Sequence, residues 1–187
     1  MARISDAICT DHSDLQSCYD RIVTADDPDE QTRYQNQWTW ELARHVVGEE
    51  AVLFPALETH LGPGATSQDR RQHQMIKQRL QVFQDLSAED PRFLPTLTLL
   101  MDDFASHVQA EEAQVLVKLE NAISAEESAR LAKSFDRTKF LAPTRAHPAL
   151  PDQPPYQTIV GLMAAPLDYL QDLFRKWPDH VPSLTME

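Results

Sequence analysis

The amino-acid sequence predicts an all-α fold: an up-down-up-down four-helix bundle made from a duplicated helical hairpin, with a short fifth helix and a proline-rich C-terminal extension that ends in a further helix. Only four glycines in 187 residues, with many Ala, Leu, Gln and Glu, favour helix. The duplication relates residues 41–58 (ELARHVVGEEAVLFPALE) to residues 103–120 (DFASHVQAEEAQVLVKLE), which agree at eight of eighteen positions. Such a repeat indicates two copies of one supersecondary unit.

The first hairpin is predicted from two amphipathic stretches. Residues 4–24 form the first helix, whose inward stripe has helical spacing and contains Ile8, His12, Leu15, Tyr19 and Ile22. The acidic sequence DDPDE separates it from a second helix over residues 30–59. The inward stripe of this second helix contains Trp38, Leu42, His45, Glu49, Val52 and Ala56. Pro55 should kink the helix or leave an irregular last turn, because proline removes a helical hydrogen bond.

The second hairpin repeats this pattern. A third helix is predicted over residues 67–86, with an inward stripe of His73, Ile76, Leu80 and Phe83. A fourth helix is predicted over residues 91–123, and its stripe contains Leu97, Leu100, Phe104, His107, Glu111, Val115 and either Lys118 or Leu119. A short fifth helix should begin after Ser124, because Ser124 and Glu127 form a capping box.

The composition changes after the fifth helix. Eight of the thirteen prolines lie from Pro143 onward, which predicts an irregular segment with one helix at residues 166–176. We therefore expect two parts: a helical bundle over residues 1–140, and a C-terminal extension over residues 141–187 that packs on the bundle.

Charge and hydropathy argue against several classes of protein. The formal net charge of -12 opposes a nucleic-acid-binding or anionic-membrane surface. No stretch approaches the roughly 18 apolar residues of a membrane span, and the N-terminus lacks the pattern of a signal peptide. Cys9 and Cys18 lie about 13 Å apart on one predicted helix, which is too far for a disulfide. We therefore expect free thiols and a cytoplasmic location.

Residues of metal-ligating type recur at matching places in the two halves. His12 lies 33 residues before His45, and His73 lies 34 residues before His107. The second histidine of each half begins an H-x-x-x-E-E motif, so that an imidazole and a glutamate four residues later share one helix face. Imidazole and carboxylate together suit iron, manganese or zinc. The candidate metal ligands are His12, His45, Glu49, His73, His107 and Glu111.

The two inward glutamates need a partner, because an unpaired carboxylate in an apolar core is very costly. Metal ions would neutralise Glu49 and Glu111 and would occupy the lone pairs of the imidazoles. The alternative explanation, a set of structural salt bridges, requires inward-facing cations, and only Lys77 is a candidate. The sequence therefore favours a site with two metal ions.

Several residues beside the motifs have roles that the sequence leaves open. Glu50 and Glu112 lie about 100° away from the inward stripe, so we expect them behind the ligands or at the surface. Glu41 and Asp103 lie one turn before a histidine, where they are either acceptors for an imidazole N–H or solvated acids. Gly48 costs about 1 kcal/mol relative to alanine inside a helix, and a close approach of another helix explains it about as well as chance does.

Four motifs carry a family resemblance: Asp11-His12, HVVGEEAVLFP from His45, the QHxxIK context of His73, and HVQAEE from His107. Over about residues 5–122, the chain resembles hemerythrin-like proteins of the HHE cation-binding family, in the fungal form that has a C-terminal extension. The resemblance implies a non-haem di-iron centre. It implies one iron bound by His12 and His45, a second iron bound by His73 and His107, and bridges from Glu49 and Glu111.

One position departs from the family pattern. The oxygen-carrying members place a second histidine four residues after the one that His73 matches, whereas this chain has Lys77. One metal therefore has one nitrogen ligand fewer, and we expect an open coordination position that accepts water, O2, peroxide or a substrate. The alternative is that Lys77 extends into solvent along its stem.

These features favour a di-iron protein that binds or reduces O2 or a related small oxidant. One alternative is a di-iron oxygenase or oxidoreductase that acts on an organic small molecule, and a pocket beside the metals would favour it. Another is metal sensing or storage, which readily reversible metal loss would favour. The expected cofactor is a pair of iron ions, with manganese or zinc less favoured. The expected partners are O2 or a small oxidant, without nucleic acid or membrane.

Overall fold

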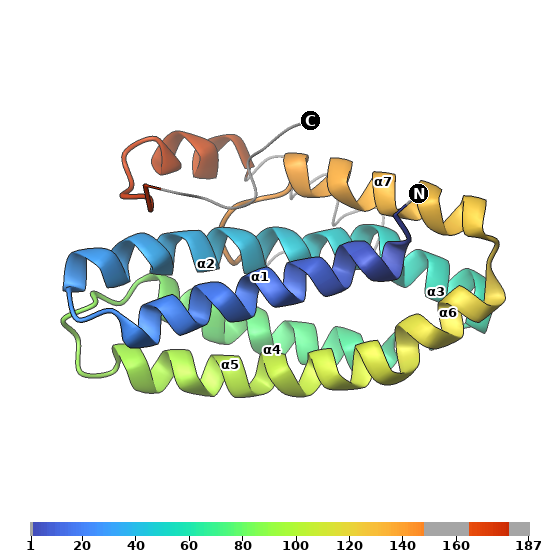
Figure 1. Cartoon of the computed structure of the whole chain (residues 1–187), viewed down its shortest axis with the longest axis horizontal. Helices are drawn as coiled ribbons and strands as arrows, with labels where there is room; N and C mark the ends of the chain where they lie inside the picture. Colours follow the sequence, from blue (N-terminus) through green and yellow to red (C-terminus); the bar gives the residue numbers. More distant parts are fainter. Residues whose placement is uncertain (1, 148–164, 180–187) are drawn as a thin grey trace.

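The protein is a bundle of long helices (Figure 1). The computed structural model describes residues 2–147 and 165–179, and within these residues it contains helices and no strand. Four long helices run along the molecule: α1 (Ile4–Thr24), α2 (Pro28–Gly48), α4 (Ser67–Gln84) and α5 (Phe93–Ala110). Helix α1 packs on α2, α2 on α4, α4 on α5 and α5 on α1, which closes the bundle. The all-α class predicted from the sequence is confirmed.

Local sequence explains where the helices begin and end. Asp27 caps α2 by accepting a hydrogen bond from the backbone N–H of Asp29 at 3.1 Å. Pro28 occupies the first turn of α2, where no helical donor is needed. Gly62 and Gly64 form the turn before α4, with φ of 97° and 84°. These left-handed conformations favour glycine, because glycine has no Cβ.

In each half, the helical segment that contains the H-x-x-x-E-E motif is interrupted by a π turn. Helix α2 continues through η1 (Glu49–Leu53) into α3 (Phe54–Leu61), and α5 continues through η2 (Glu111–Val115) into α6 (Leu116–Ala122). Both π turns begin at the first glutamate of the H-x-x-x-E-E motif. Single π turns inside α-helices frequently occur at functional sites, so this shared irregularity marks the motif in both halves.

The irregularity predicted at Pro55 lies earlier in the chain than expected. Pro55 sits in the first turn of α3, after the π turn has ended. The same π turn occurs in the second half, where Val117 takes the place of the proline. The proline therefore does not cause the π turn, and the element common to both halves is the motif itself.

The π turns change which side chains reach the core after each glutamate. The helical stripe predicted Val52 and Val115 as inward residues, but both are only half-buried. Leu53 and Leu116 are buried instead, at 0% and 2% exposure. A π turn adds about one residue to a helical turn, so the inward face moves one position along the chain.

A fifth helix, α7 (Ala125–Leu141), packs across α1 and α2 (Figure 1). Its 17 residues make it longer than the short helix predicted. The predicted cap is present, since Ser124 Oγ accepts a hydrogen bond from the N–H of Glu127 at 3.2 Å. Gly48 lies beneath this helix, and a Cβ added there would lie 2.7 Å from Cε2 of Phe135. The close approach of α7 therefore explains the glycine.

The core consists of two apolar clusters with a polar layer between them. On α1, Ile8 belongs to one cluster and Leu15 to the other, and His12 lies between the two. The cluster of Leu15 also contains Trp38, Leu42, Leu80 and Phe104. The cluster of Ile8 also contains Leu53, Leu57, Leu119 and Phe135. The histidines and glutamates of the motifs therefore lie inside the bundle, with apolar packing on both sides.

The described part of the C-terminal extension packs on α2. Its helix covers residues 165–172, whereas residues 166–176 were predicted. Asn36 of α2 donates from Nδ2 to the carbonyl oxygen of Lys176 at 3.1 Å. Most of the prolines that define the extension lie outside the described residues, which omit 148–164 and 180–187.

Two expectations from composition concern membranes and cysteines. None of the described helices combines the length and the apolar character that a membrane crossing requires. Cys9 and Cys18 are both free thiols. Burial, followed by the charge of Glu112, raises the pKa of Cys9 to about 11, so this thiol keeps its proton at neutral pH.

Candidate metal centre

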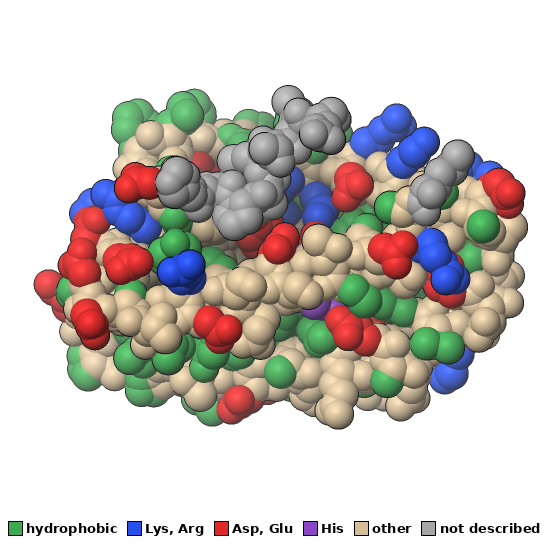
Figure 2. Space-filling model, in the orientation of Figure 1, with side chains coloured by type: hydrophobic (Ala, Val, Ile, Leu, Met, Phe, Trp, Pro, Cys, Tyr) green, Lys and Arg blue, Asp and Glu red, His purple; other side chains and the backbone are tan. Residues whose placement is uncertain are grey.

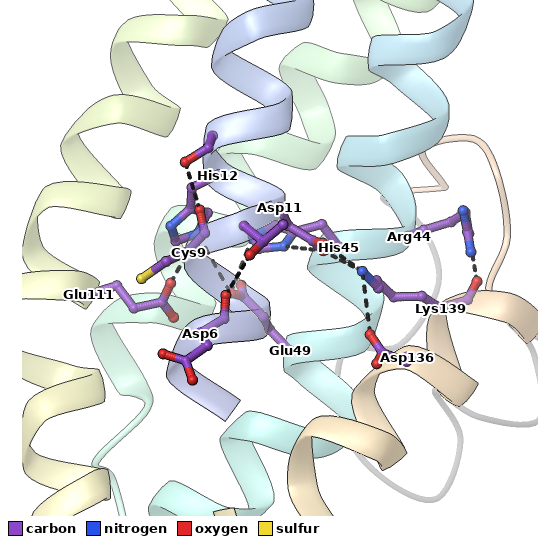
Figure 3. A network of polar contacts seen from close by, with 12 residues as sticks. Asp6, Cys9, Asp11, His12, Arg44, His45, Glu49, Glu111, Asp136 and Lys139 are labelled. Carbon is purple, nitrogen blue, oxygen red and sulfur yellow. Dashed lines mark hydrogen bonds and ion pairs between the residues drawn. The ribbon is translucent and has the colours of Figure 1, made fainter. Parts of the chain in front are cut away.

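The six residues predicted as ligands come together in the polar layer. They project from α1, α2, η1, α4, α5 and η2, and they are His12, His45, Glu49, His73, His107 and Glu111. Each of them is at most 5% exposed. Figure 3 shows His12, His45, Glu49 and Glu111 close together between their helices. The fold thus brings the complete candidate set into one buried group.

Glu49 directs one carboxylate oxygen toward each pair of histidines. Its Oε1 lies 3.2 Å from His45 Nε2 and 4.0 Å from His12 Nε2. Its Oε2 lies 3.1 Å from His73 Nε2 and 3.8 Å from His107 Nε2. With each pair, Glu49 forms a set whose ligand atoms all lie within 4.8 Å of one another. We call the place beside His12 and His45 position 1, and the place beside His73 and His107 position 2.

Glu111 faces the same centre from the other half of the duplication. Its Oε2 lies 3.4 Å from His12 Nε2 at position 1 and 3.9 Å from His107 Nε2 at position 2. At position 2, the Nε2 atoms of His73 and His107 are 3.2 Å apart. Two imidazoles bound at right angles to one ion, with bonds of about 2.1 Å, are about 3 Å apart. The observed spacing therefore suits a shared ion.

On the outer side of each imidazole, a polar side chain accepts a hydrogen bond from Nδ1. The Nδ1 atoms face four acceptors: Glu112 Oε1 at 2.7 Å from His12, Asp11 Oδ2 at 3.2 Å from His45, Glu50 Oε1 at 3.3 Å from His73, and Gln72 Oε1 at 3.3 Å from His107. Because these oxygens accept, each Nδ1 donates its proton outward and each Nε2 faces the centre. The four rings are thus oriented by contacts outside the ligand set.

The four acceptors occupy equivalent positions in the two halves of the duplication. The residue before the first histidine of each half, Asp11 or Gln72, holds the second histidine of the same half. The second glutamate of each E-E pair, Glu50 or Glu112, holds the first histidine of the other half. Glu50 is 2% exposed, whereas the side chain of Glu112 is 41% exposed. Both glutamates therefore lie behind the ligands, and Glu112 also reaches the surface.

The acceptor role considered for Glu41 and Asp103 is filled by Asp11 and Gln72. Asp103 forms an ion pair with Arg79 instead. Asp11 and Gln72 were not predicted as acceptors, because each holds a histidine on a neighbouring helix, more than 30 residues away in the chain. The available signal was the polar residue immediately before the first histidine of each half.

Two lysines hold two of these acceptors in place. Lys139 of α7 donates from Nζ to both oxygens of Asp11, at 2.6 and 2.8 Å (Figure 3). Lys77 of α4 donates to both oxygens of Glu50, at 2.8 and 3.1 Å. The side chain of Lys77 is 12% exposed, so it is directed to Glu50 rather than into solvent. An open coordination position at position 2 stays a prediction.

The polar atoms of the centre fit metal ions. Among the described residues, six buried atoms of the candidate ligands have no hydrogen-bond partner: Nε2 of His12, Nε2 of His45, and both oxygens of Glu49 and of Glu111. Burial lowers the pKa of His12 and His73, but nearby carboxylates outweigh it and raise the pKa of both to about 9. Burial and the charge of Glu49 raise the pKa of Glu111. Metal ions would replace these protons and would give the unpartnered atoms a bond.

Phenylalanine rings enclose the histidines. The Phe104 ring centre lies 5.7 Å from that of His12 and 6.0 Å from that of His45. The Phe54 ring centre lies 4.9 Å from that of His73. Both phenylalanines are at most 1% exposed. These rings keep water from the centre, and charges therefore interact there more strongly than in water.

Comparison with known proteins agrees with this geometry. Residues 3–119 match the family described as "Hemerythrin HHE cation binding domain". An uncharacterized hemerythrin-like protein of Schizosaccharomyces pombe is 47% identical over 181 residues, which cover 95% of this chain and 89% of that protein. A protein of Nostoc sp. named DNA nickase is 26% identical over 136 residues, which cover 73% of this chain and 39% of that protein. No solved structure matches the chain. The chain belongs to the hemerythrin HHE cation-binding family.

Proposed function

We propose that this chain is a non-haem di-iron protein that binds or reduces O2 or a related small oxidant at a carboxylate-bridged centre. The observation that carries the proposal is the placement of Glu49, whose two oxygens face the two histidine pairs separately. Glu111 also faces both positions, through its Oε2. Two-metal sites hold their ions about 3.5–4 Å apart, a separation that shared carboxylates of this kind support.

Iron at these positions would supply one-electron oxidation and reduction and a coordination position for the oxidant. The residues of the chain prepare the site for that chemistry. The Nδ1 contacts fix the direction of each imidazole, so that the Nε2 atoms face the centre before an ion binds. The carboxylates of Glu49 and Glu111 offset part of the charge of two cations, and Phe54 and Phe104 exclude water.

A surface cavity lies on the outer side of His12. The cavity has a volume of about 240 Å³ and is lined by Arg3, Ser5, Cys9, Glu112, Leu116, Val117, Glu120 and Asn121. Its Glu112 contacts Nδ1 of His12, which faces away from position 1, so the cavity lies behind that imidazole. Its volume is below the roughly 300–1,000 Å³ of pockets that enclose drug-sized ligands. The alternative reading, an oxygenase or oxidoreductase for an organic molecule, requires a pocket beside the metal positions, and this cavity does not supply it.

Metal sensing or storage is a further alternative, in which ions exchange without turnover. The ion pairs of Lys77 with Glu50 and of Lys139 with Asp11 hold the groups behind two imidazoles. Such preorganised support favours a fixed centre over one that exchanges its ions readily. Loss of iron to a weak chelator at neutral pH would favour storage instead.

We include no nucleic acid among the proposed partners. One relative is named DNA nickase, but the matching residues cover 39% of that protein. The net charge of -12 on this chain repels a phosphate backbone, and acidic side chains are spread over the face that Figure 2 shows. The proposed partners are therefore O2 or a small oxidant.

Metal analysis of protein purified without added metal, together with an optical spectrum recorded in air, tests the proposal. We expect two iron ions per chain and an absorption band in air that disappears on chemical reduction. Zinc as the sole metal after expression in iron-rich medium would contradict the proposed oxidant chemistry.

A further inference from the structure

The second half of the duplication has a buried carboxylate that the first half lacks. Asp69 lies in the first turn of α4, four residues before His73 and on the same helix face. The equivalent residue in the first half, four before His12, is Ile8, which lies in the apolar core at 0% exposure. Asp69 is itself only 5% exposed. An ionised carboxylate costs far more to bury than isoleucine unless a cation lies nearby or the carboxylate binds a proton, so Asp69 needs one of these two partners.

The charged neighbours of Asp69 belong to position 2. Burial raises the pKa of Asp69, whereas the imidazoles of His107 and His73 lower it and Glu49 raises it further. The nearby basic residues of α4 bind other carboxylates: Arg70 pairs with Glu58 at 3.3 Å, and Lys77 pairs with Glu50. A metal ion at position 2 would supply such a cation and would keep Asp69 ionised without a proton.

Position 2 also has a lysine one turn after its first histidine. Lys77, four residues after His73, is held by Glu50. Asp69 lies one helical turn before His73 and on the same helix face, whereas Lys77 lies one turn after it. The compact set of Glu49, His73 and His107 does not include Asp69, and its carboxylate would reach the ion by rotation of its side chain.

We propose that Asp69 is a seventh residue of the metal centre and supplies a carboxylate oxygen to the ion at position 2. The inference rests on the proposed dinuclear centre and deepens it. An added carboxylate makes position 2 more anionic than its histidines alone would, and it favours a hard ion of high charge there. The two positions, which the repeat makes nearly equivalent, then differ in their ligands.

The competing explanation is that Asp69 only stabilises the N-terminus of α4, as acids in the first turn do. Asp6 provides a matched control, because it is the first-turn acid of α1 and accepts from the N–H of Arg3 at 2.9 Å. Titration of the metal-free protein with Co2+, followed by its visible absorption, measures binding directly. The variants Asp69→Asn and Asp6→Asn should be compared in the same titration.

Two further variants test whether Asp69 acts at position 2 and not at position 1. His45→Ala leaves position 2 with both of its histidines, and His107→Ala leaves position 1 with both of its own. We expect Asp69→Asn to weaken Co2+ binding about 10–100-fold in the first background and to have no effect in the second. Asp6→Asn should have no effect in either. An equal loss in both backgrounds, or no loss in either, would overturn the inference.

Folding is checked separately by circular dichroism. If Asp69→Asn does not fold, Asp69→Ser keeps a short polar side chain in the first turn of α4 and should show the same selective loss; unchanged affinity would overturn the inference. The inference and the proposed function can fail separately. Wild-type protein that binds two Co2+ ions, with no effect of Asp69→Asn, contradicts only the inference. Wild-type protein that binds one Co2+ ion contradicts the dinuclear centre itself.

Discussion

Lys77 donates from its ammonium to both carboxylate oxygens of Glu50, at 2.8 and 3.1 Å, and Glu50 lies 3.3 Å from Nδ1 of His73. Lys77 therefore acts from behind an imidazole. It fixes the carboxylate that orients His73, and it neutralises the charge of that buried carboxylate.

Removal of this ammonium should destabilise the protein. We predict that Lys77→Met lowers the free energy of unfolding by about 3 kcal/mol, because it removes the ammonium that pairs with the buried carboxylate of Glu50. Urea denaturation measures the change. The double variant Glu50→Gln/Lys77→Met should recover much of the loss, since it removes the buried charge as well. Equal losses in the single and double variants would contradict the argument.

Loss of either bridging glutamate should empty both metal positions. The Glu49 oxygens lie 3.2 Å from His45 Nε2 and 3.1 Å from His73 Nε2, so one side chain serves both ions. We expect Glu49→Ala or Glu111→Ala to abolish binding of both metals, and His12→Ala to weaken one. Metal content measured by mass spectrometry of the native protein tests this order. The reverse order would overturn the assignment of the bridges.

A methyl group at Gly48 should disturb the contact between α2 and α7. We predict that Gly48→Ala lowers the free energy of unfolding by about 1–3 kcal/mol, since its Cβ would lie 2.7 Å from Cε2 of Phe135. This loss occurs although alanine favours helix by about 1 kcal/mol. The matched variant Ala110→Gly, at the equivalent position, should lose only the helix propensity. A more stable Gly48→Ala protein would show that α7 adjusts without cost.

The contribution of Glu120 should depend on pH. Burial raises the pKa of Glu120, but hydrogen bonds from Ser5, Arg3 and Ser128 outweigh it and lower the pKa below 4.5. Because the folded pKa is below the unfolded pKa, the stabilisation is present above about pH 4.5 and is lost as the pH falls through the folded pKa. Glu120→Gln should therefore be less stable than wild type at neutral pH.

The urea midpoints of wild type and Glu120→Gln, measured at neutral pH and below about pH 4, test that prediction. The difference between the two proteins should shrink in acid. A difference that is the same at both pH values would show that the carboxylate charge of Glu120 does not contribute.

Metal removal should lower the thermal midpoint. An ion that binds the folded centre and not the unfolded chain adds about 4 kcal/mol when its free concentration is about 1,000 times its Kd. Calorimetry of loaded and chelator-treated protein measures the shift. An unchanged midpoint would contradict a metal site in the core.

The helical bundle and the convergence of the six candidate ligands were predictable because they depend on local periodicity and on a repeat. His45 and Glu49 share a helix face through their spacing alone, and the same spacing recurs at His107 and Glu111. The stripes therefore identified the inward residues correctly as far as each motif glutamate.

Other features depend on packing and could not be read from spacing. The π turns shift the inward face from Val52 to Leu53, which a pattern with a period of 3.6 residues does not reveal. Lys139 reaches Asp11 only because α7 packs across α1 and α2. The groups behind the imidazoles therefore follow from tertiary contacts rather than from the motifs.

Anomalous X-ray diffraction at the iron absorption edge, from crystals of protein expressed in iron-rich medium, tests the central claim most directly. We predict two anomalous peaks per chain, about 3–4 Å apart, between Glu49 and Glu111. A single peak at full loading, or peaks away from these two carboxylates, would contradict the dinuclear centre.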